Sequence, residues 1–138
     1  VLRQPDGSEV QVSAGPTDTD PSFLPGKEGF LYVSVDSSRI MECSGQAKVC
    51  HAIYADPLMP GYPTVDPSGQ QIAYVTSLLN VSRVRVISRH APATYRDLGP
   101  ALPCGPVWTS SRRLWVAVSH KSNRTTLTDA DVDTTTPT

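Results

Sequence analysis

Hydrophobic residues along this chain fall in short runs of four to six, and no segment has convincing helical spacing. Three near-continuous apolar runs are typical of inner strands buried on both faces. These runs lie at 30–35, 72–75 and 114–118. Between them, 39–43 and 83–87 alternate polar and apolar residues, which favours strands with one face in solvent. The pattern predicts an all-β chain.

Shorter and more polar segments complete the pattern. They lie at 10–12, 48–50 and 93–95, and their composition favours outer edge strands. The proline content, 13 of 138 residues, also favours turns and edge strands over long helices.

The strands belong to a unit that occurs three times. Each copy opens with a proline, places an apolar residue two positions later, turns, and enters a buried strand. The copies span 21–34, 63–76 and 106–118, and their opening prolines are 42 and 43 residues apart (63 − 21 and 106 − 63). A period of about 40 to 45 residues with short strands is typical of β-propeller blades. The residues two positions after the prolines, Phe23, Val65 and Trp108, are expected to point inward.

The repeat predicts one domain at residues 1–127, with units near 6–43, 44–87 and 88–127. Each unit contains a polar strand, a Gly/Pro loop, a short strand, a buried strand and an alternating strand, which makes four strands per unit. Residues 128–138 contain almost no apolar side chains, so they predict a flexible, acidic, Thr-rich tail.

The second copy, PTVDPSGQQIAYV at 63–75, resembles the WD40-like repeat of TolB-type β-propellers. The core of that repeat is Pro-x-Trp-Ser-Pro-Asp-Gly-x-x-Ile-Ala-Phe. Trp108 stands at the tryptophan position, and Pro25 and Pro67 stand at the second proline. The resemblance covers roughly residues 6–119. The Asp-Gly turn departs from it, because it is Ser68-Gly69 in the second copy and is lost in the other two.

The resemblance implies six blades, whereas this chain has about three. The expected fold is therefore all-β, with about three four-stranded blades, or half of a six-bladed propeller. Two chains could pair as three plus three, the chain could be half of a longer propeller, or it could be an open fragment with protected ends. The first two are favoured. The absence of an initiator Met favours a processed chain or one cut from a longer protein.

Three cysteines are present. Cys43 and Cys50 would face each other in a hairpin centred on 45–48, where a disulfide or two reduced thiols fit equally well. Cys104 is expected to be a small buried apolar residue.

No metal, cofactor or catalytic motif is recognised. The segment 129–133 has the first three acidic positions of a calcium loop but lacks its glycine and closing glutamate, so a solvated tail is favoured. The acidic loop at 17–20 favours loop hydrogen bonding. His51, His90 and His120 recur at unequal spacings, which argues against a symmetric ring of ligands.

Four arginines gather near the junction of the second and third units. Arg83, Arg85, Arg89 and Arg96, with His90 and Tyr95, could form a binding patch, although an ordinary charged outer strand is favoured. The net charge of −1 gives no reason to expect nucleic acid, and no apolar run is long enough to insert into a membrane.

The expected function is a non-catalytic module that binds a protein or peptide partner. The resemblance implies a periplasmic, secreted or cell-surface location. A peptide could cross the rim loops near 56–62 and 96–104 or enter the central channel. Two alternatives remain open: the ectodomain of a bacterial receptor or signalling kinase, and a propeller that gates a peptidase or hydrolase domain.

Overall fold

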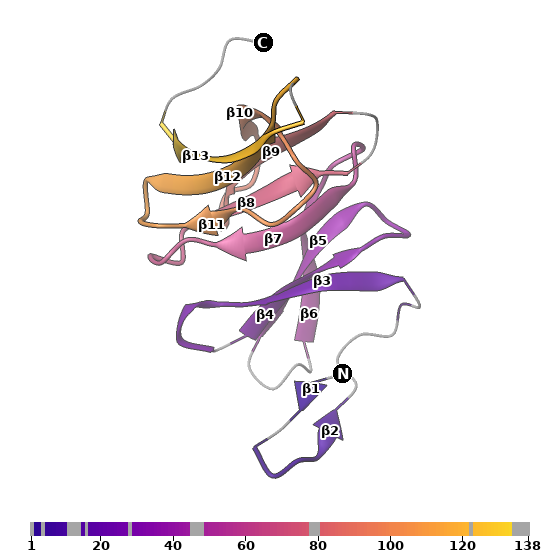
Figure 1. The fold of residues 1–138 in the computed structure, drawn as a ribbon. Helices are drawn as coiled ribbons and strands as arrows, with labels where there is room; N and C mark the ends of the chain where they lie inside the picture. The colour runs from indigo at the N-terminus through magenta and orange to yellow at the C-terminus, as the bar shows by residue number, and fades with distance from the viewer. Residues whose placement is uncertain are drawn as a thin grey trace.

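The structure, a computed structural model, describes residues 2–3, 5–10, 15, 17–27, 29–44, 49–77, 81–121 and 123–133. Across these residues the chain is all-β, as predicted. It forms three antiparallel sheets of four, four and three strands, preceded by the hairpin of β1 (Leu2–Arg3) and β2 (Glu9–Val10) (Figure 1). In these ranges the only helical turn is η1 (Pro25–Lys27).

The three sheets follow one another along the chain, and each begins with its innermost strand. The first sheet contains β3 (Asp18–Phe23), β4 (Gly29–Ser34), β5 (Arg39–Ser44) and β6 (Val49–Ala55). The second contains β7 (Pro60–Val65), β8 (Gln71–Thr76), β9 (Ser82–Ser88) and β10 (Tyr95–Ala101). The third contains β11 (Val107–Trp108), β12 (Arg113–Ser119) and β13 (Thr125–Asp131).

The sheets stack in sequence order, so the second is covered on both faces (Figure 1). We call the contact between the first and second sheets the first seam, and that between the second and third the second seam. The buried core of the first seam comprises Leu24, Leu31, Ile40, Val65, Ile72, Tyr74 and Ile87. That of the second comprises Ala73, Val75, Val84, Val86, Leu114, Val116 and Val132.

Strand β8 shows why its apolar run has no polar gaps. Successive side chains on a strand point to opposite faces. Ile72 and Tyr74 therefore enter the first seam while Ala73 and Val75 enter the second, and all four are at most 1% exposed. A strand buried on both faces needs an apolar residue at every position.

The inner strands β3 and β7 contain the same irregularity. Each shifts register just before its proline, and the residues at that point, Asp20 and Tyr62, have positive φ angles of 55° and 51°. The backbone N–H of Tyr62 donates to the Asp20 carboxylate over 3.0 Å, which ties the two bulges together. The repeat therefore reproduces a local backbone distortion as well as an apolar pattern.

The sheets are offset from the predicted units. The polar strand expected to open each unit instead completes the sheet of the unit before it: β6 pairs with β5, and β10 pairs with β9. Each sheet of four strands therefore crosses a unit boundary. Residues 11 and 12 of the first predicted outer strand lie outside the described ranges, as does Lys48.

The predicted start of the tail, at residue 128, is wrong. Strand β13 continues to Asp131 and pairs with β12 over its whole length, and Val132 is 1% exposed. The segment is polar because only alternate side chains face the second seam, where Ala130 and Val132 pack. Residues 134–138 of the predicted tail lie outside the described ranges.

Strand β9 also differs from the expected half-exposed strand. Val84, Arg85, Val86 and Ile87 are all buried. An arginine is accommodated there because it meets the buried carboxylate of Asp56, which directly follows β6. Alternation along one strand does not reveal this long-range contact.

Candidate functional site

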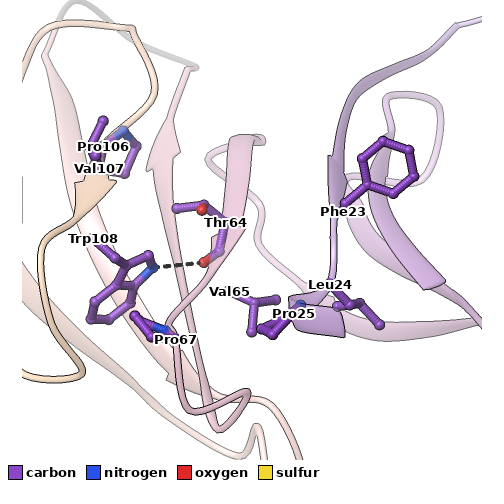
Figure 2. A pocket seen from close by; sticks show the side chains of 9 residues that line it. All are labelled: Phe23, Leu24, Pro25, Thr64, Val65, Pro67, Pro106, Val107 and Trp108. Carbon is purple, nitrogen blue, oxygen red and sulfur yellow. Dashed lines mark hydrogen bonds between the residues drawn. The ribbon is translucent and has the colours of Figure 1, made fainter. Parts of the chain in front are cut away.

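A hollow of about 450 Å³ lies across the inner strands of the three sheets (Figure 2). Its walls come from the repeated motif and the turns that follow it. The lining residues are Phe23, Leu24, Pro25, Thr64, Val65, Pro67, Pro106, Val107 and Trp108. Because equivalent segments of three repeats contribute, the hollow exists only when the sheets are stacked.

Trp108 is fixed in this hollow from two sides. It pairs with Leu114 in the β11–β12 register, which directs its ring toward the second sheet. Its indole Nε1–H donates to the backbone oxygen of Thr64 over 3.0 Å (Figure 2). The bond satisfies the polar atom of the ring and leaves its apolar surface for packing. The structure agrees with the prediction that the Trp108 side chain points inward. It also agrees with the same prediction for Val65, which is buried in the first seam.

The same prediction is wrong for Phe23, whose side chain is 60% exposed. Val65 and Trp108 each pack toward the sheet that precedes their own. Phe23 occupies the equivalent position on the first sheet, which has only the short β1–β2 hairpin before it. Its sequence environment is that of an inward residue, but the sheet that would cover it is missing from the described residues.

The turn after β7 supports one wall of the hollow. The Asp66 carboxylate accepts hydrogen bonds from the backbone N–H groups of Gln70 and Gln71 at 2.8 Å and from the Ser68 hydroxyl at 2.5 Å. Burial by itself raises the pKa of Asp66, but these hydrogen bonds outweigh it and hold the pKa below its ordinary value. The turn is thereby held in one conformation beside Pro67.

The chemistry of the hollow is apolar. None of its nine lining side chains titrates near neutral pH, and the only side-chain hydroxyl among them belongs to Thr64. Such a surface suits contact with apolar or proline-rich segments more than bond-making chemistry. The sequence marked Phe23, Val65 and Trp108 but missed Leu24, Thr64 and Val107, which the neighbouring motif positions could have indicated.

The four arginines do not form one open patch. Arg85 and Arg83 pair with the buried carboxylates Asp56 and Asp97 at 2.7 and 2.8 Å. Arg89 pairs with Glu42 at 2.5 Å, across the first seam.

Arg96 faces the second seam instead. It donates to the backbone oxygen of Val132 and to the side chain of Gln71, both over 2.7 Å. The four side chains therefore stabilise sheet contacts, which agrees with the favoured interpretation of a structural strand.

The most deeply buried of these charges form a cluster in the first seam. The Tyr74 hydroxyl and Arg85 Nη1 both lie 2.7 Å from Asp56 Oδ2, and the Arg85 guanidinium stacks 3.9 Å from the Tyr95 ring centroid. Burial raises the pKa of Asp56, but the Tyr74 hydroxyl, the Leu58 N–H and Arg85 outweigh it and hold the pKa low. Burial and the Asp56 hydrogen bond raise the pKa of Tyr74. The ion pair is packed against apolar core residues, so we assign it a structural role.

The histidines and acidic segments are dispersed. Among the residues that the structure describes, no group of three His, Cys, Asp or Glu side chains could hold a metal ion. His51 lies 3.8 Å from Glu42, whereas His120 contacts Thr126.

The acidic segments take part in ion pairs and loop contacts. Asp129 pairs with Arg113, and Asp133 pairs with Arg96 and Arg112. In the loop at 17–20, Asp18 accepts from the backbone N–H of Gly15.

The structure joins Cys43 and Cys50 in a disulfide across β5 and β6, where they are register partners. The prediction for Cys104 is wrong, because this thiol is exposed. It lies in the loop between β10 and β11.

Comparison with solved structures shows which known proteins share this architecture. The chain superimposes on TolB from Acinetobacter baumannii with a TM-score of 0.73 and 16% identity, covering 87% of this chain and 31% of that one. It also superimposes on a Mycobacterium tuberculosis puromycin-hydrolyzing peptidase with a TM-score of 0.71 and 14% identity, covering 85% of this chain and 21% of that one. No family model and no curated protein matches the sequence.

These likenesses establish the fold: the chain is built as part of a TolB-like β-propeller, as the repeat predicted. It spans about a third of the TolB chain and a fifth of the peptidase chain. Within the described ranges, no helix is long and apolar enough to span a membrane.

Proposed function

We propose that this chain is a non-catalytic interaction module that binds an apolar segment of a protein or peptide. The observation that carries the proposal is the hollow, which three propeller blades line with apolar side chains. Concave, preformed and mainly apolar surfaces are the usual sites of recognition.

The residues around the hollow are already held in place by hydrogen bonds, so binding there would require little loss of conformational entropy. Trp108 is held by its hydrogen bond to Thr64, and Asp66 fixes the adjoining turn. A rigid receptor loses little conformational freedom when a ligand enters. An extended segment that carries prolines or aromatic residues matches these walls, since aromatic and proline rings pack well on one another.

We further propose that the three blades form half of a closed propeller. Propellers generally close with four to eight blades, so three blades leave a ring incomplete. A second copy of the chain is the assembly that we favour for the remaining half. The alternative is that the remaining blades lie on the same longer polypeptide.

An extracytoplasmic location accompanies this proposal. A structural disulfide such as Cys43–Cys50 persists in oxidising compartments and is rare in the cytosol. Intact mass with and without reductant tests the bond, which is present if reduction adds the mass of two hydrogen atoms. Unchanged mass would remove this support.

The other two functions from the sequence remain alternatives. An ectodomain of a receptor or signalling kinase would use the same module to sense a ligand. A propeller that gates a hydrolase domain has some support from the fold likeness to a peptidase. The full-length gene would separate them by what adjoins the propeller.

Selection of a displayed random peptide library on this chain tests the binding function. Trp115→Phe makes Trp108 the sole tryptophan, since the chain has two. Selected peptides are expected to shift Trp108 fluorescence and to bind about tenfold more weakly to Pro67→Lys, which places a charge in the hollow. Gln70→Lys is the matched control, because it alters an exposed residue of the same turn that does not line the hollow. Equal binding to both variants would count against the hollow.

A further inference from the structure

The three sheets allow the same position to be compared in three surroundings. In the strand register, β12 matches β4 and β8, so Trp115 occupies the position of Leu31 and Ala73. All three side chains point toward where the next sheet along the chain would lie. Leu31 and Ala73 are each 0% exposed because that next sheet is present, whereas Trp115 is 49% exposed.

The neighbouring strands give the same result. Leu127 pairs with Ala117 on the face of Trp115, as Ile40 pairs with Val33 and Val84 with Val75. Leu127 is 66% exposed, while Ile40 and Val84 are 0% and 1% exposed.

Val107, the register partner of Trp115 on β11, is 58% exposed. We call Val107, Trp115 and Leu127 the free face of the third sheet. An exposed apolar face of this kind on a rigid sheet is characteristic of an interaction surface.

The first sheet exposes an apolar side chain on its opposite side. Phe23 is 60% exposed, at the position where Val65 and Trp108 contact a preceding sheet. Phe30, Tyr32 and Cys43 lie on the same side but pack on one another and are at most 9% exposed. The two ends of the stack therefore expose apolar side chains, Phe23 at one end and Trp115 and Leu127 at the other, at positions that pack against a neighbouring sheet in the first and second seams.

We infer that the free face of the third sheet is an interface for a second copy of this chain, which packs there with the Phe23 side of its first sheet. The inference deepens the ring closure in the proposed function, on which it rests. Two such contacts, related by a twofold axis, would close three blades against three.

The strand inventory supports a second copy as the occupant. The third sheet has three strands where the others have four, and in the described residues β13 pairs only with β12. Strand β2 belongs to the repeat position that β6 and β10 occupy, and these are the outer strands of their sheets. The hairpin β1–β2 lies beyond the first sheet, at the end of the stack opposite β13 (Figure 1). Among the described residues, β2 therefore pairs outside the three large sheets, and the third sheet has no fourth strand, so strand addition at the β13 edge would supply one.

Light scattering on a sizing column over a concentration series tests the interface. The mass is expected to approach twice the 14.9 kDa of one chain and to fall on dilution. Trp115→Lys and Leu127→Lys should keep the single-chain mass at concentrations where the parent pairs. Val81→Lys is the control, because Val81 is 57% exposed but precedes β9, away from both end faces. A single-chain mass of the parent up to its solubility limit would overturn the inference.

Mixing two variants tests the orientation. Phe23→Lys disrupts the Phe23 side but keeps the free face, whereas Trp115→Lys disrupts the free face but keeps the Phe23 side. Each variant alone should therefore stay monomeric. A mixture of the two should form a two-chain species, because it supplies one intact free face and one intact Phe23 side. Pairing of Phe23→Lys by itself would mean that third sheets pack on each other and would overturn the head-to-tail contact. Circular dichroism melting of each variant checks that it folds.

These readouts separate the two proposals. A single-chain species that still binds the selected peptide would overturn the interface alone. A two-chain species from which no peptide is selected would overturn binding at the hollow and leave the interface intact.

Discussion

Between the first and second sheets the seam buries charge, whereas between the second and third it relies on small aliphatic side chains. The first seam encloses Asp56 and Arg85, with side chains 1% and 9% exposed. The second seam has Ala73 and several valines at its centre, and its polar contacts mostly end on backbone oxygens, such as that between Arg96 and Val132.

This difference affects how specifically each seam selects the sheet that packs against it. A buried ion pair contributes little net stability compared with a well-packed apolar pair, but removing one partner is costly because the other charge remains buried. The first seam therefore accepts only a matching sheet. The second seam, with mainly apolar packing, tolerates changes of comparable volume.

The largest expected effect comes from breaking the charged seam. Asp56→Ala should lower the free energy of unfolding by about 3 to 5 kcal/mol, because it leaves the Arg85 guanidinium buried and removes the acceptor of the Tyr74 hydroxyl. Urea denaturation followed by circular dichroism measures the loss.

Two control variants test whether the loss of stability in Asp56→Ala comes from the unpaired charge. The pair Asp56→Leu with Arg85→Met should cost much less than the sum of the single changes, since no unpaired charge remains. In the second seam, Arg96→Met should cost only about 1 kcal/mol, because it removes hydrogen bonds from a partly exposed side chain. Equal losses in the two seams would contradict the contrast between them.

Acid should weaken the first seam before the second. The pKa values of Asp56 and Asp97 lie below the ordinary 3.8, because hydrogen bonds and arginines outweigh the opposing effect of burial. The unfolded chain therefore binds more protons than the folded chain near and below that pH. The stabilisation is present above pH 3.8 and is lost as pH falls through the lower folded pKa values.

The measurement is the urea midpoint between pH 6 and pH 2.5, about the range in which carboxylates titrate. Asp97→Asn should reduce the acid dependence, because one of the carboxylates with a lowered pKa no longer titrates. An unchanged slope in this variant would show that other carboxylates control the acid response.

Much of the fold follows from local pattern. The apolar runs predicted the strands β4, β8 and β12. Burial on both faces is confirmed for β8, which cannot alternate for that reason. The same expectation is wrong for β12, because one of its faces is free and Trp115 is 49% exposed. The repeat also indicated part of the hollow, because it equates Val65 with Trp108 and equivalent positions of stacked sheets lie side by side.

The remainder depends on neighbours that a repeat does not specify. Nothing near Asp56 in the sequence indicates that it meets Arg85, which is 29 residues away. Phe23 looks like an inward residue because its repeat position is inward wherever a preceding sheet exists. Cys104 looks like a core residue by type, but it lies in the loop between β10 and β11 with its side chain exposed.

The smallest expected effect concerns the free face of the third sheet, which no other sheet of the described residues covers in a single chain. At a dilution where the chain has its single-chain mass, Trp115→Ala should change the free energy of unfolding by less than about 0.5 kcal/mol, as exposed positions generally do. Leu31→Ala, at the equivalent position of the first sheet, should cost about 2 to 5 kcal/mol because it opens a cavity in the first seam. A cost for Trp115→Ala as large as that for Leu31→Ala would mean that the chain covers its own free face. The end of the stack would then be closed, and no second copy would be needed to bury it.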